Sequence, residues 1–185
     1  LLPTVADQMN GLREALGPLR DRLVGVGVAA PFQLGGWHRM LGLSQEQSQA
    51  WNQIDLRAQV QDMTEVPVTF AKDTSAACVA ELVLGRGREL KNFLYLFVGT
   101  FVGGGLVINS HLHGGLHGNA GAVASLPMRL AGRASTEPTP PDQLISHASL
   151  WELEHRLSAL ALDPHAAYDA RALQAPHVDE TLAWI

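Results

Sequence analysis

The segment 93–108 limits the fold more than any other part of the sequence. It reads Phe-Leu-Tyr-Leu-Phe-Val-Gly-Thr-Phe-Val-Gly-Gly-Gly-Leu-Val-Ile. Its two apolar runs, Phe93–Val98 and Leu106–Ile108, have the aromatic and branched composition of buried strands. A glycine-rich connection between two strands predicts a β-hairpin, so we expect a sheet with at least one antiparallel pair.

The connection of this hairpin contains more glycine than a turn requires. Two interpretations remain open for Gly99-Thr100 and Gly103–Gly105. Glycines let several backbone N–H groups approach one anion, which predicts a phosphate loop. Alternatively, the turn only needs residues that adopt positive φ. A single glycine-rich loop is a weak motif, so this segment alone does not separate the two.

Strand and helix patterns alternate before the hairpin. Strands are expected over Leu23–Val28 and Val66–Phe70. Helices are expected over Val5–Leu16, after Ser44 and Asp55 as N-caps, and over Thr74–Leu84. After the hairpin we expect a Gly- and His-rich loop over His111–Ser125, a Pro-rich linker over Ala134–Asp142, one helix over Leu144–Leu162, and short helices over 166–173 and 178–185.

Charge and cysteine content exclude several classes of protein. The net charge of −5, with neutral histidines, argues against a basic surface for nucleic acid in this segment. The single cysteine, Cys78, cannot form an intrachain disulfide or a Cys-based zinc site, and it fits a cytoplasmic setting. No apolar run reaches membrane-spanning length. The sequence starts without Met, so we expect it to be a segment of a longer protein.

Asp73 is the candidate for chemistry. It follows the expected strand Val66–Phe70 and opens the expected Ala-rich helix. A carboxylate at the carboxyl end of a strand, beside a helix N-terminus, is well placed to act as a general base. Helix N-capping is the more common role of Asp at such a position, and both interpretations stay open.

Four motifs in series resemble the ROK family of bacterial sugar kinases and sugar-responsive repressors. They are Gly-x-Gly-x-Ala-Ala-Pro ending at Pro31, Asp73 before a small-residue helix with Glu81, Gly-Thr-x-x-Gly-Gly-Gly over 99–105, and Gly-x-His-Gly-x-Ala-Gly over 115–121. The resemblance implies an α/β, actin-like ATPase (ribonuclease H-like) fold, with a mixed sheet flanked by helices and a sugar cleft between two lobes.

The resemblance also implies roles for individual residues. Asp73 matches the catalytic base of the family's kinases. The hairpin matches the second phosphate loop, which implies phosphate-binding roles for Gly99, Thr100, Gly103, Gly104 and Gly105. The positions that match the sugar cleft are Pro31, Phe32, Lys72, Asp73, His117, Gly118, Ala122 and Ser125.

Several of these cleft positions depart from the family pattern. Phe32 stands in place of a glycine and Lys72 in place of an asparagine, and Ala122 and Ser125 replace a Glu and a His that hold sugar hydroxyls. Each lost hydrogen bond to a buried hydroxyl costs about 1–3 kcal/mol, so ordinary hexose binding should be lost. The family's Cys-rich zinc motif is absent, and so is its opening Asp-x-Gly-x-Thr phosphate motif. This segment alone is therefore not expected to be a kinase.

These observations predict one incomplete ROK domain over 1–185, with the first lobe and any helix-turn-helix outside this segment. The expected function is the effector-binding and oligomerisation region of a ROK-type transcriptional regulator of sugar metabolism. It would take a small sugar effector, form a homodimer, and contact DNA through a separate N-terminal domain.

The main alternative is a sugar kinase of altered specificity, similar to a glucokinase or an N-acetylhexosamine kinase. ATP with magnesium would be a cofactor only in that case. A third alternative is a dimerisation module built on Leu144–Leu162. No zinc is expected, and His111, His113 and His117 are not favoured as metal ligands because no carboxylate or cysteine accompanies them. Trp51 is interpreted as a packing residue.

Overall fold

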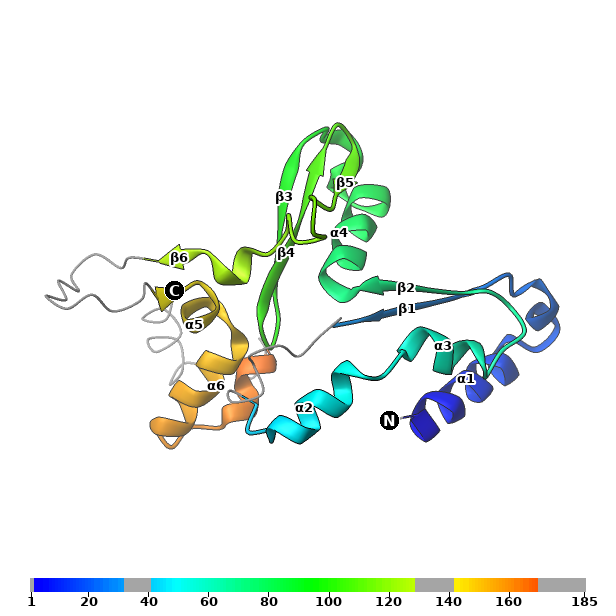
Figure 1. The fold of residues 1–185 in the computed structure, drawn as a ribbon, viewed down its shortest axis with the longest axis horizontal. Coiled ribbons are helices and arrows are strands. Elements are labelled where there is room, and N and C mark those ends of the chain that lie inside the picture. The colour runs from blue at the N-terminus through cyan, green and yellow to red at the C-terminus, as the bar shows by residue number, and fades with distance from the viewer. Residues whose placement is uncertain (1, 32–40, 129–141, 170–185) are drawn as a thin grey trace, which may run out of the picture. The chain divides into compact units, whose positions relative to one another are not determined.

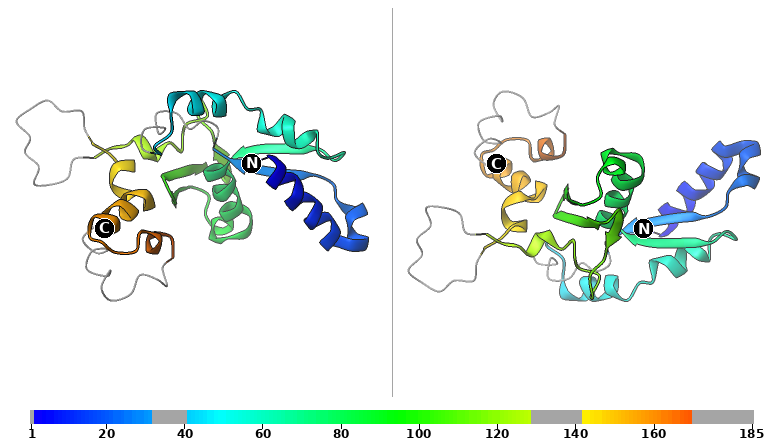
Figure 2. Two further views of the ribbon diagram at one scale, coloured as in Figure 1. Left: turned by 90° about the horizontal axis from the view of Figure 1, so that it is seen from below. Right: turned by 90° about the horizontal axis from the view of Figure 1, so that it is seen from above.

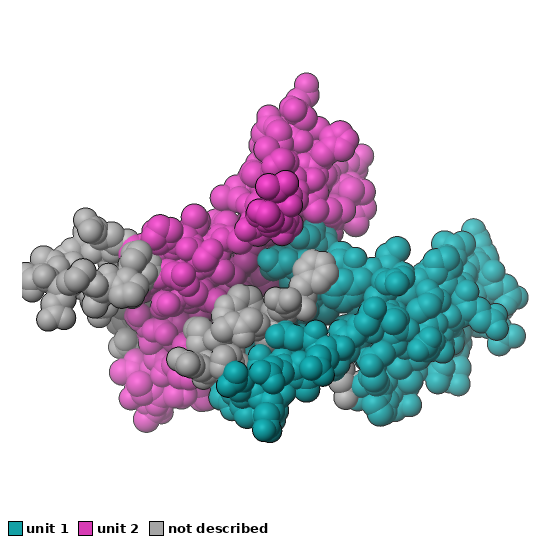
Figure 3. Space-filling view, viewed as in Figure 1, with its two compact units in different colours: residues 1–76 teal, residues 77–185 magenta. Residues whose placement is uncertain are grey.

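The computed structural model describes residues 2–31, 41–128 and 142–169. Phe32, the expected linker up to residue 141, and the expected helix over 178–185 lie outside the described residues. The chain divides into two compact units, residues 1–76 and 77–185 (Figure 3).

Two parallel strands, β1 (Val26–Ala30) and β2 (Val68–Lys72), form the sheet of the first unit (Figure 1). Their register runs from Val26 opposite Val68 to Ala30 opposite Lys72. Both strands begin later than the sequence predicted. The N–H of Leu23 still closes the preceding turn on Arg20 O, and the first bond between the two segments runs from Val26 N–H to Pro67 O at 2.9 Å. Proline can only accept such a bond, so the paired strand starts after it.

The helices of the first unit follow the sequence pattern closely. Helix α1 (Leu2–Leu16) ends at Gly17, whose φ of +51° favours glycine, and continues as the 3₁₀ helix η1 (Gly17–Arg22). The expected caps are confirmed. Ser44 and Gln47 form a capping box at the start of α2 (Gln45–Asn52), and Asp55 Oδ1 accepts the N–H of Ala58 at 2.9 Å before α3 (Leu56–Gln61).

The hairpin is confirmed as the centre of the second unit. Strand β3 (Phe93–Val98) pairs with β4 (Val102–Ile108), and β4 pairs with β5 (His111–His113), so the order is β3-β4-β5 and both pairs are antiparallel. The predicted extent of the turn is wrong. Gly103, Gly104 and Gly105 lie within β4, opposite Phe97, Leu96 and Tyr95 respectively. His111–His113 forms strand β5, although the sequence predicted a loop there.

Helix α4 (Asp73–Leu84) lies along one face of this sheet (Figures 1 and 2). Its small residues allow a close approach: Cys78 is fully buried, and a Cβ on Gly105 would lie 2.5 Å from the Cβ of Cys78. The 3₁₀ helix η3 (Arg86–Glu89) then leads into β3.

The helix expected over Leu144–Leu162 is interrupted. It consists of α5 (Ile145–Ala148) and α6 (Leu150–Ala159), separated by Ser149 in an extended conformation. Ser149 is fully buried, and its Oγ accepts the N–H of Glu152 as the N-cap of α6. The remaining short elements are η4 (Val123–Ser125), the pair β6 (Pro127–Met128) with β7 (Asp142–Gln143), and η5 (Pro164–Tyr168).

A small core holds α6 and η5 together. Leu153 and Leu157 of α6 are buried with Ala166 and Ala167 of η5, and Leu162 packs against this cluster. None of the described helices is long and apolar enough to cross a bilayer.

Candidate functional site

The first unit brings together three of the predicted cleft residues. Ala30 pairs with Lys72, so Pro31, which follows β1, and Asp73, which follows β2, lie at the same end of the parallel pair. Ligands of open α/β sheets gather at this carboxyl end. Pro31, Lys72 and Asp73 thus lie at one end of this strand pair, and their role in a sugar cleft stays a prediction. Phe32 lies outside the described residues.

Asp73 is the first residue of α4 and is half-buried. Its Oδ1 accepts the N–H of Thr74 at 2.7 Å. The adjacent Thr74 hydroxyl is buried and has no hydrogen-bond partner among the described residues. The carboxylate therefore contacts the first turn of its own helix, and Oδ2 has no hydrogen-bond partner within the part of the chain that the structure describes. That arrangement fits both interpretations of Asp73, as a helix-end residue and as a general base.

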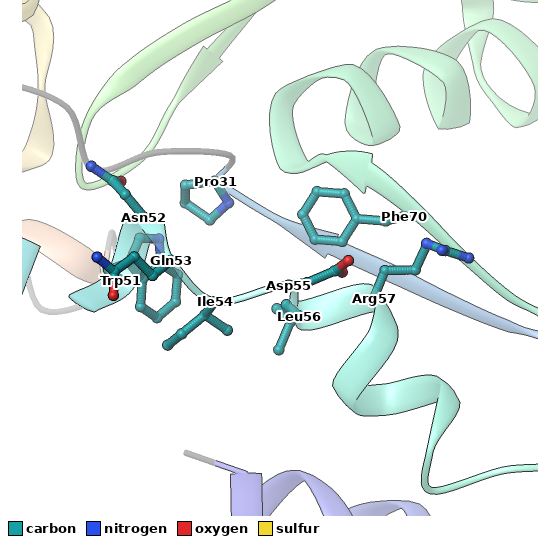
Figure 4. Close-up of a pocket in the computed structure, with 9 residues that line it drawn as sticks. All are labelled: Pro31, Trp51, Asn52, Gln53, Ile54, Asp55, Leu56, Arg57 and Phe70. Carbon is teal, nitrogen blue, oxygen red and sulfur yellow. The ribbon is translucent and has the colours of Figure 1, made fainter. Parts of the chain in front are cut away.

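A cavity of about 410 Å³ opens near the same end of the sheet, within the first unit (Figure 4). Residues 51–57, which run from the end of α2 to the start of α3, form most of its wall, and Pro31 and Phe70 complete it. Sequence reasoning assigned Trp51 to packing and missed this cavity. The sequence contains only a weak indication of this cavity. An aromatic residue and two amides, Trp51, Asn52 and Gln53, lie shortly before Asp55, the N-cap of the next helix.

The second unit holds the predicted phosphate-binding residues. Other residues of this unit form hydrogen bonds with the hairpin turn that joins β3 to β4. The N–H groups of Leu150 and Trp151, at the start of α6, donate to Gly99 O at 2.9 Å and to Thr100 O at 3.2 Å. The N–H of Gly99 donates to Phe101 O at 3.3 Å. The N-terminus of α6 thus binds the turn carbonyls, as helix N-termini bind other acceptors.

The side chain of Thr100 is also engaged, by Tyr168 of η5. The phenolic oxygen of Tyr168 accepts a hydrogen bond from Thr100, and its hydroxyl donates to Glu154 Oε2 at 2.8 Å. Burial, followed by the hydrogen bond and the negative charge of Glu154, raises the pKa of Tyr168 above its usual value near 10, and the bond from Thr100 opposes this. Sequence reasoning missed Tyr168 because nothing in its local sequence links it to residue 100.

Two of the three glycines of β4, Gly104 and Gly105, have a packing role in this structure. Gly105 makes room for Cys78, and a Cβ on Gly104 would lie 2.5 Å from Tyr95 O and 3.2 Å from Val123 Cγ2. A Cβ on Gly121 would collide with Gly104 O. Close approach of α4 and of segment 121–125 therefore explains why glycine stands at these positions. The predicted role of Gly103, Gly104 and Gly105 in binding phosphate stays a prediction.

The remaining cleft residues of the second unit lie on or beside a loop. His117 and Gly118 are exposed, and Gly118 has a φ of +69°. Ala122 precedes η4, and the hydroxyl of Ser125 donates to Ala122 O at 3.1 Å. In this geometry the only polar side chain at these two positions thus bonds to its own main chain.

The histidines of β5 and its following loop form no cluster with other ligands. His111 and His113 are exposed, and His111 Nδ1 lies 2.7 Å from Asn109 O. Across the described ranges, no group of three or more His, Cys, Asp or Glu side chains is arranged to hold a metal ion.

Relatives of known sequence include both kinases and repressors. A glucokinase of Halalkalibacterium halodurans is 26% identical over 172 residues, which cover 86% of this chain and 50% of the glucokinase. The xylose repressor of Bacillus subtilis is 26% identical over 110 residues, or 60% of this chain and 28% of the repressor. The chain therefore spans half or less of the length of these relatives.

Solved structures establish the fold. A ROK family transcriptional regulator, a homologue of the E. coli MLC protein, matches 86% of this chain and 39% of its own at a TM-score of 0.60 and 19% identity. The ROK hexokinase of Thermus thermophilus matches 92% of this chain and 58% of its own at a TM-score of 0.57 and 22% identity. The fold is the α/β, actin-like ATPase fold, as expected.

The family is shown by the sequence itself. The model of the ROK family matches residues 3–138, which is more than half of the chain. This span includes both strands of the first unit, the hairpin and all predicted site residues. The chain belongs to the ROK family, whose members similar to it include sugar kinases and transcriptional repressors.

Proposed function

We propose that this chain is the effector-binding and oligomerisation region of a ROK-family transcriptional regulator of sugar metabolism. In this proposal a small sugar is the effector, the protein is a homodimer, and a separate domain contacts DNA. The relatives that match this chain include repressors, among them the xylose repressor of Bacillus subtilis.

The engaged hairpin turn carries the proposal. A phosphate loop presents several N–H groups to an anion, and Gly99 N–H instead donates to Phe101 O. Gly99 O and Thr100 O accept from α6, and Thr100 also bonds to Tyr168. Binding a phosphate through the Gly99 N–H would require its bond to Phe101 O to break, whereas a regulator has no such requirement.

The substituted cleft supports the same function. Ala122 offers no polar side chain, and the Ser125 hydroxyl bonds to Ala122 O. A kinase must hold its sugar rigidly against the base, because positioning supplies much of the rate. An effector site only needs differential binding between two states, which weaker contacts can provide.

A ligand screen tests this proposal. The midpoint of thermal unfolding is measured with ATP and magnesium, with glucose, with N-acetylglucosamine and with xylose, each alone. The regulator predicts stabilisation by at least one sugar and none by ATP with magnesium. Stabilisation by ATP together with phosphorylation of a sugar in a coupled assay would refute it.

The second candidate is a sugar kinase of altered specificity. The position of Asp73 at the end of β2, with Oδ2 available, favours it. This candidate predicts sugar-dependent ATP hydrolysis that falls at least about 100-fold in Asp73→Asn, because general-base catalysis contributes about 10²–10⁴-fold. A rate left intact by Asp73→Asn would remove Asp73 from the role of base.

A further inference from the structure

We infer that residues 149–168 form an autoinhibitory lid, which docks on the turn between β3 and β4 and keeps this turn closed to phosphate-bearing anions (Figure 1). The lid consists of α6 and η5, and its contact with Gly99 and Thr100 is the docked state. This inference goes beyond the proposed function, because it concerns how the turn is opened and closed rather than which effector the protein binds.

The lid has a small core of its own. Leu153 and Leu157 of α6 pack against Ala166 and Ala167 of η5, and all four side chains are buried. Among the described residues, none of β3 or β4 belongs to this cluster. The apolar contacts that stabilise the lid therefore lie inside it, and they need not break when the lid leaves the turn.

Hydrogen bonds attach the lid to the turn. The N–H of Leu150 donates to Gly99 O at 2.9 Å. The N–H of Trp151 donates to Thr100 O at 3.2 Å. The Thr100 hydroxyl donates to the phenolic oxygen of Tyr168, which is 44% exposed. Water can replace such bonds at the surface, so a segment held by them opens more readily than one held by a packed core.

The start of α6 is fixed so that its first donors meet the turn. Ser149 is fully buried in an extended conformation, and its Oγ accepts the N–H of Glu152 at 3.3 Å. The N–H groups of Leu150 and Trp151 have no acceptor within their own helix, as is general for the first turn of a helix. The carbonyl groups of the hairpin turn satisfy them, and water can do so after the lid has moved.

The docked lid takes up a donor that an anion would need. Thr100 carries the only polar side chain between residues 99 and 105, and its proton is directed to Tyr168. Tyr168 is oriented in turn by Glu154, whose Oε2 accepts the phenolic proton at 2.8 Å. The negative charge of Glu154 beside Tyr168 also disfavours a second anion there. The Thr100 hydroxyl therefore becomes available to an oxyanion only after the lid has moved.

Amide hydrogen exchange followed by NMR tests whether the lid leaves the turn as a unit. Tyr168→Phe removes the phenolic hydroxyl, so the amides of Leu150 and Trp151 should exchange about tenfold faster, as expected for the loss of about one hydrogen bond. The amide of Leu157 should keep its rate, because the core of the lid stays folded. Equal acceleration at Leu157, or no acceleration at Leu150 and Trp151, would overturn the inference.

Tyr95→Phe is the matched control for this exchange experiment. Tyr95 is the only other tyrosine of the chain and lies in β3, and its hydroxyl makes no hydrogen bond within the described residues. This variant should leave exchange at Leu150 and Trp151 unchanged. If it accelerates exchange there as much as Tyr168→Phe does, the effect is a general loosening of the hairpin and the lid is refuted.

Inorganic pyrophosphate tests the autoinhibition itself, by calorimetric titration. Tyr168→Phe should bind it at least about tenfold more tightly than the parent chain does, because affinity falls with the fraction of open lid. Adding Thr100→Val to Tyr168→Phe should abolish this gain, since valine has the shape of threonine without its hydroxyl. If the parent chain and Tyr168→Phe bind pyrophosphate equally, or if neither binds it, the lid does not control the turn. That result overturns the inference and leaves the proposed function standing.

Discussion

Gly105 of β4 lies so close to Cys78 of α4 that an added Cβ would come within 2.6 Å of its Sγ. Gly105→Ala should therefore destabilise the fold by about 1–3 kcal/mol, the usual cost of overpacking a tight contact. Chemical denaturation measures this free energy of unfolding. Gly114→Ala is the control, because nothing lies within 4 Å of a Cβ at Gly114. Equal effects of the two substitutions would contradict the close contact.

The pKa of Tyr168 predicts how stability changes with pH. Burial and Glu154 raise this pKa above 10, so the folded state holds the phenolic proton more tightly than the unfolded state does. The resulting stability is present below pH 10 and is lost as pH rises through the folded pKa. Tyr168→Phe should show a shallower decline in unfolding free energy above pH 10 than the parent chain. Parallel curves for the two proteins would show that Tyr168 does not contribute.

Ser149 should be essential for the break between α5 and α6. Its Oγ accepts from Glu152 at 3.3 Å, so Ser149→Ala removes the cap and should cost about 1–2 kcal/mol. Ser158→Ala, at an exposed position of the same helix, should be neutral or slightly stabilising because alanine favours helix. Thermal unfolding of both variants measures the difference. A Ser149→Ala chain as stable as Ser158→Ala would be inconsistent with this cap.

The two faces of the β3-β4-β5 sheet should respond differently to charge. Val107 is fully buried, so Val107→Asp should cost about 3–5 kcal/mol, the cost of an uncompensated buried charge. Leu96 is 55% exposed, so Leu96→Asp should cost about 1 kcal/mol or less. The unfolding free energies of the two variants test this. Similar losses would mean that something covers the Leu96 face in solution.

Local features were predictable from sequence because local chemistry determines them. The caps at Ser44 and Asp55, the helix α1 and the strand β3 all follow from residue types within a few positions. The strand before Asp73 was also predicted from such a local pattern, but β2 ends at Lys72, two residues after the predicted end at Phe70.

The features that were missed depend on contacts between distant segments. Gly103–Gly105 were interpreted as part of a turn because glycine is common in turns, but all three lie in β4, where α4 packs on Gly105 and segment 121–125 packs on Gly104. The helix over Leu144–Leu162 had a continuous apolar stripe, and the bonds from Leu150 and Trp151 to Gly99 and Thr100, together with the Ser149 cap, explain why α6 starts at Leu150. The cavity near Phe70 likewise joins residues that are far apart in sequence.

The glycine triplet of β4 affects how such sequences should be compared. Any larger residue at position 104 or 105 must first find room beside Tyr95 O or Cys78, whether or not a nucleotide ever binds. A descendant that abandons phosphoryl transfer would therefore keep these glycines for architectural reasons. The presence of these glycines in a sequence therefore indicates the fold. Assigning an ATP-dependent activity to such a sequence needs evidence from other residues of the protein.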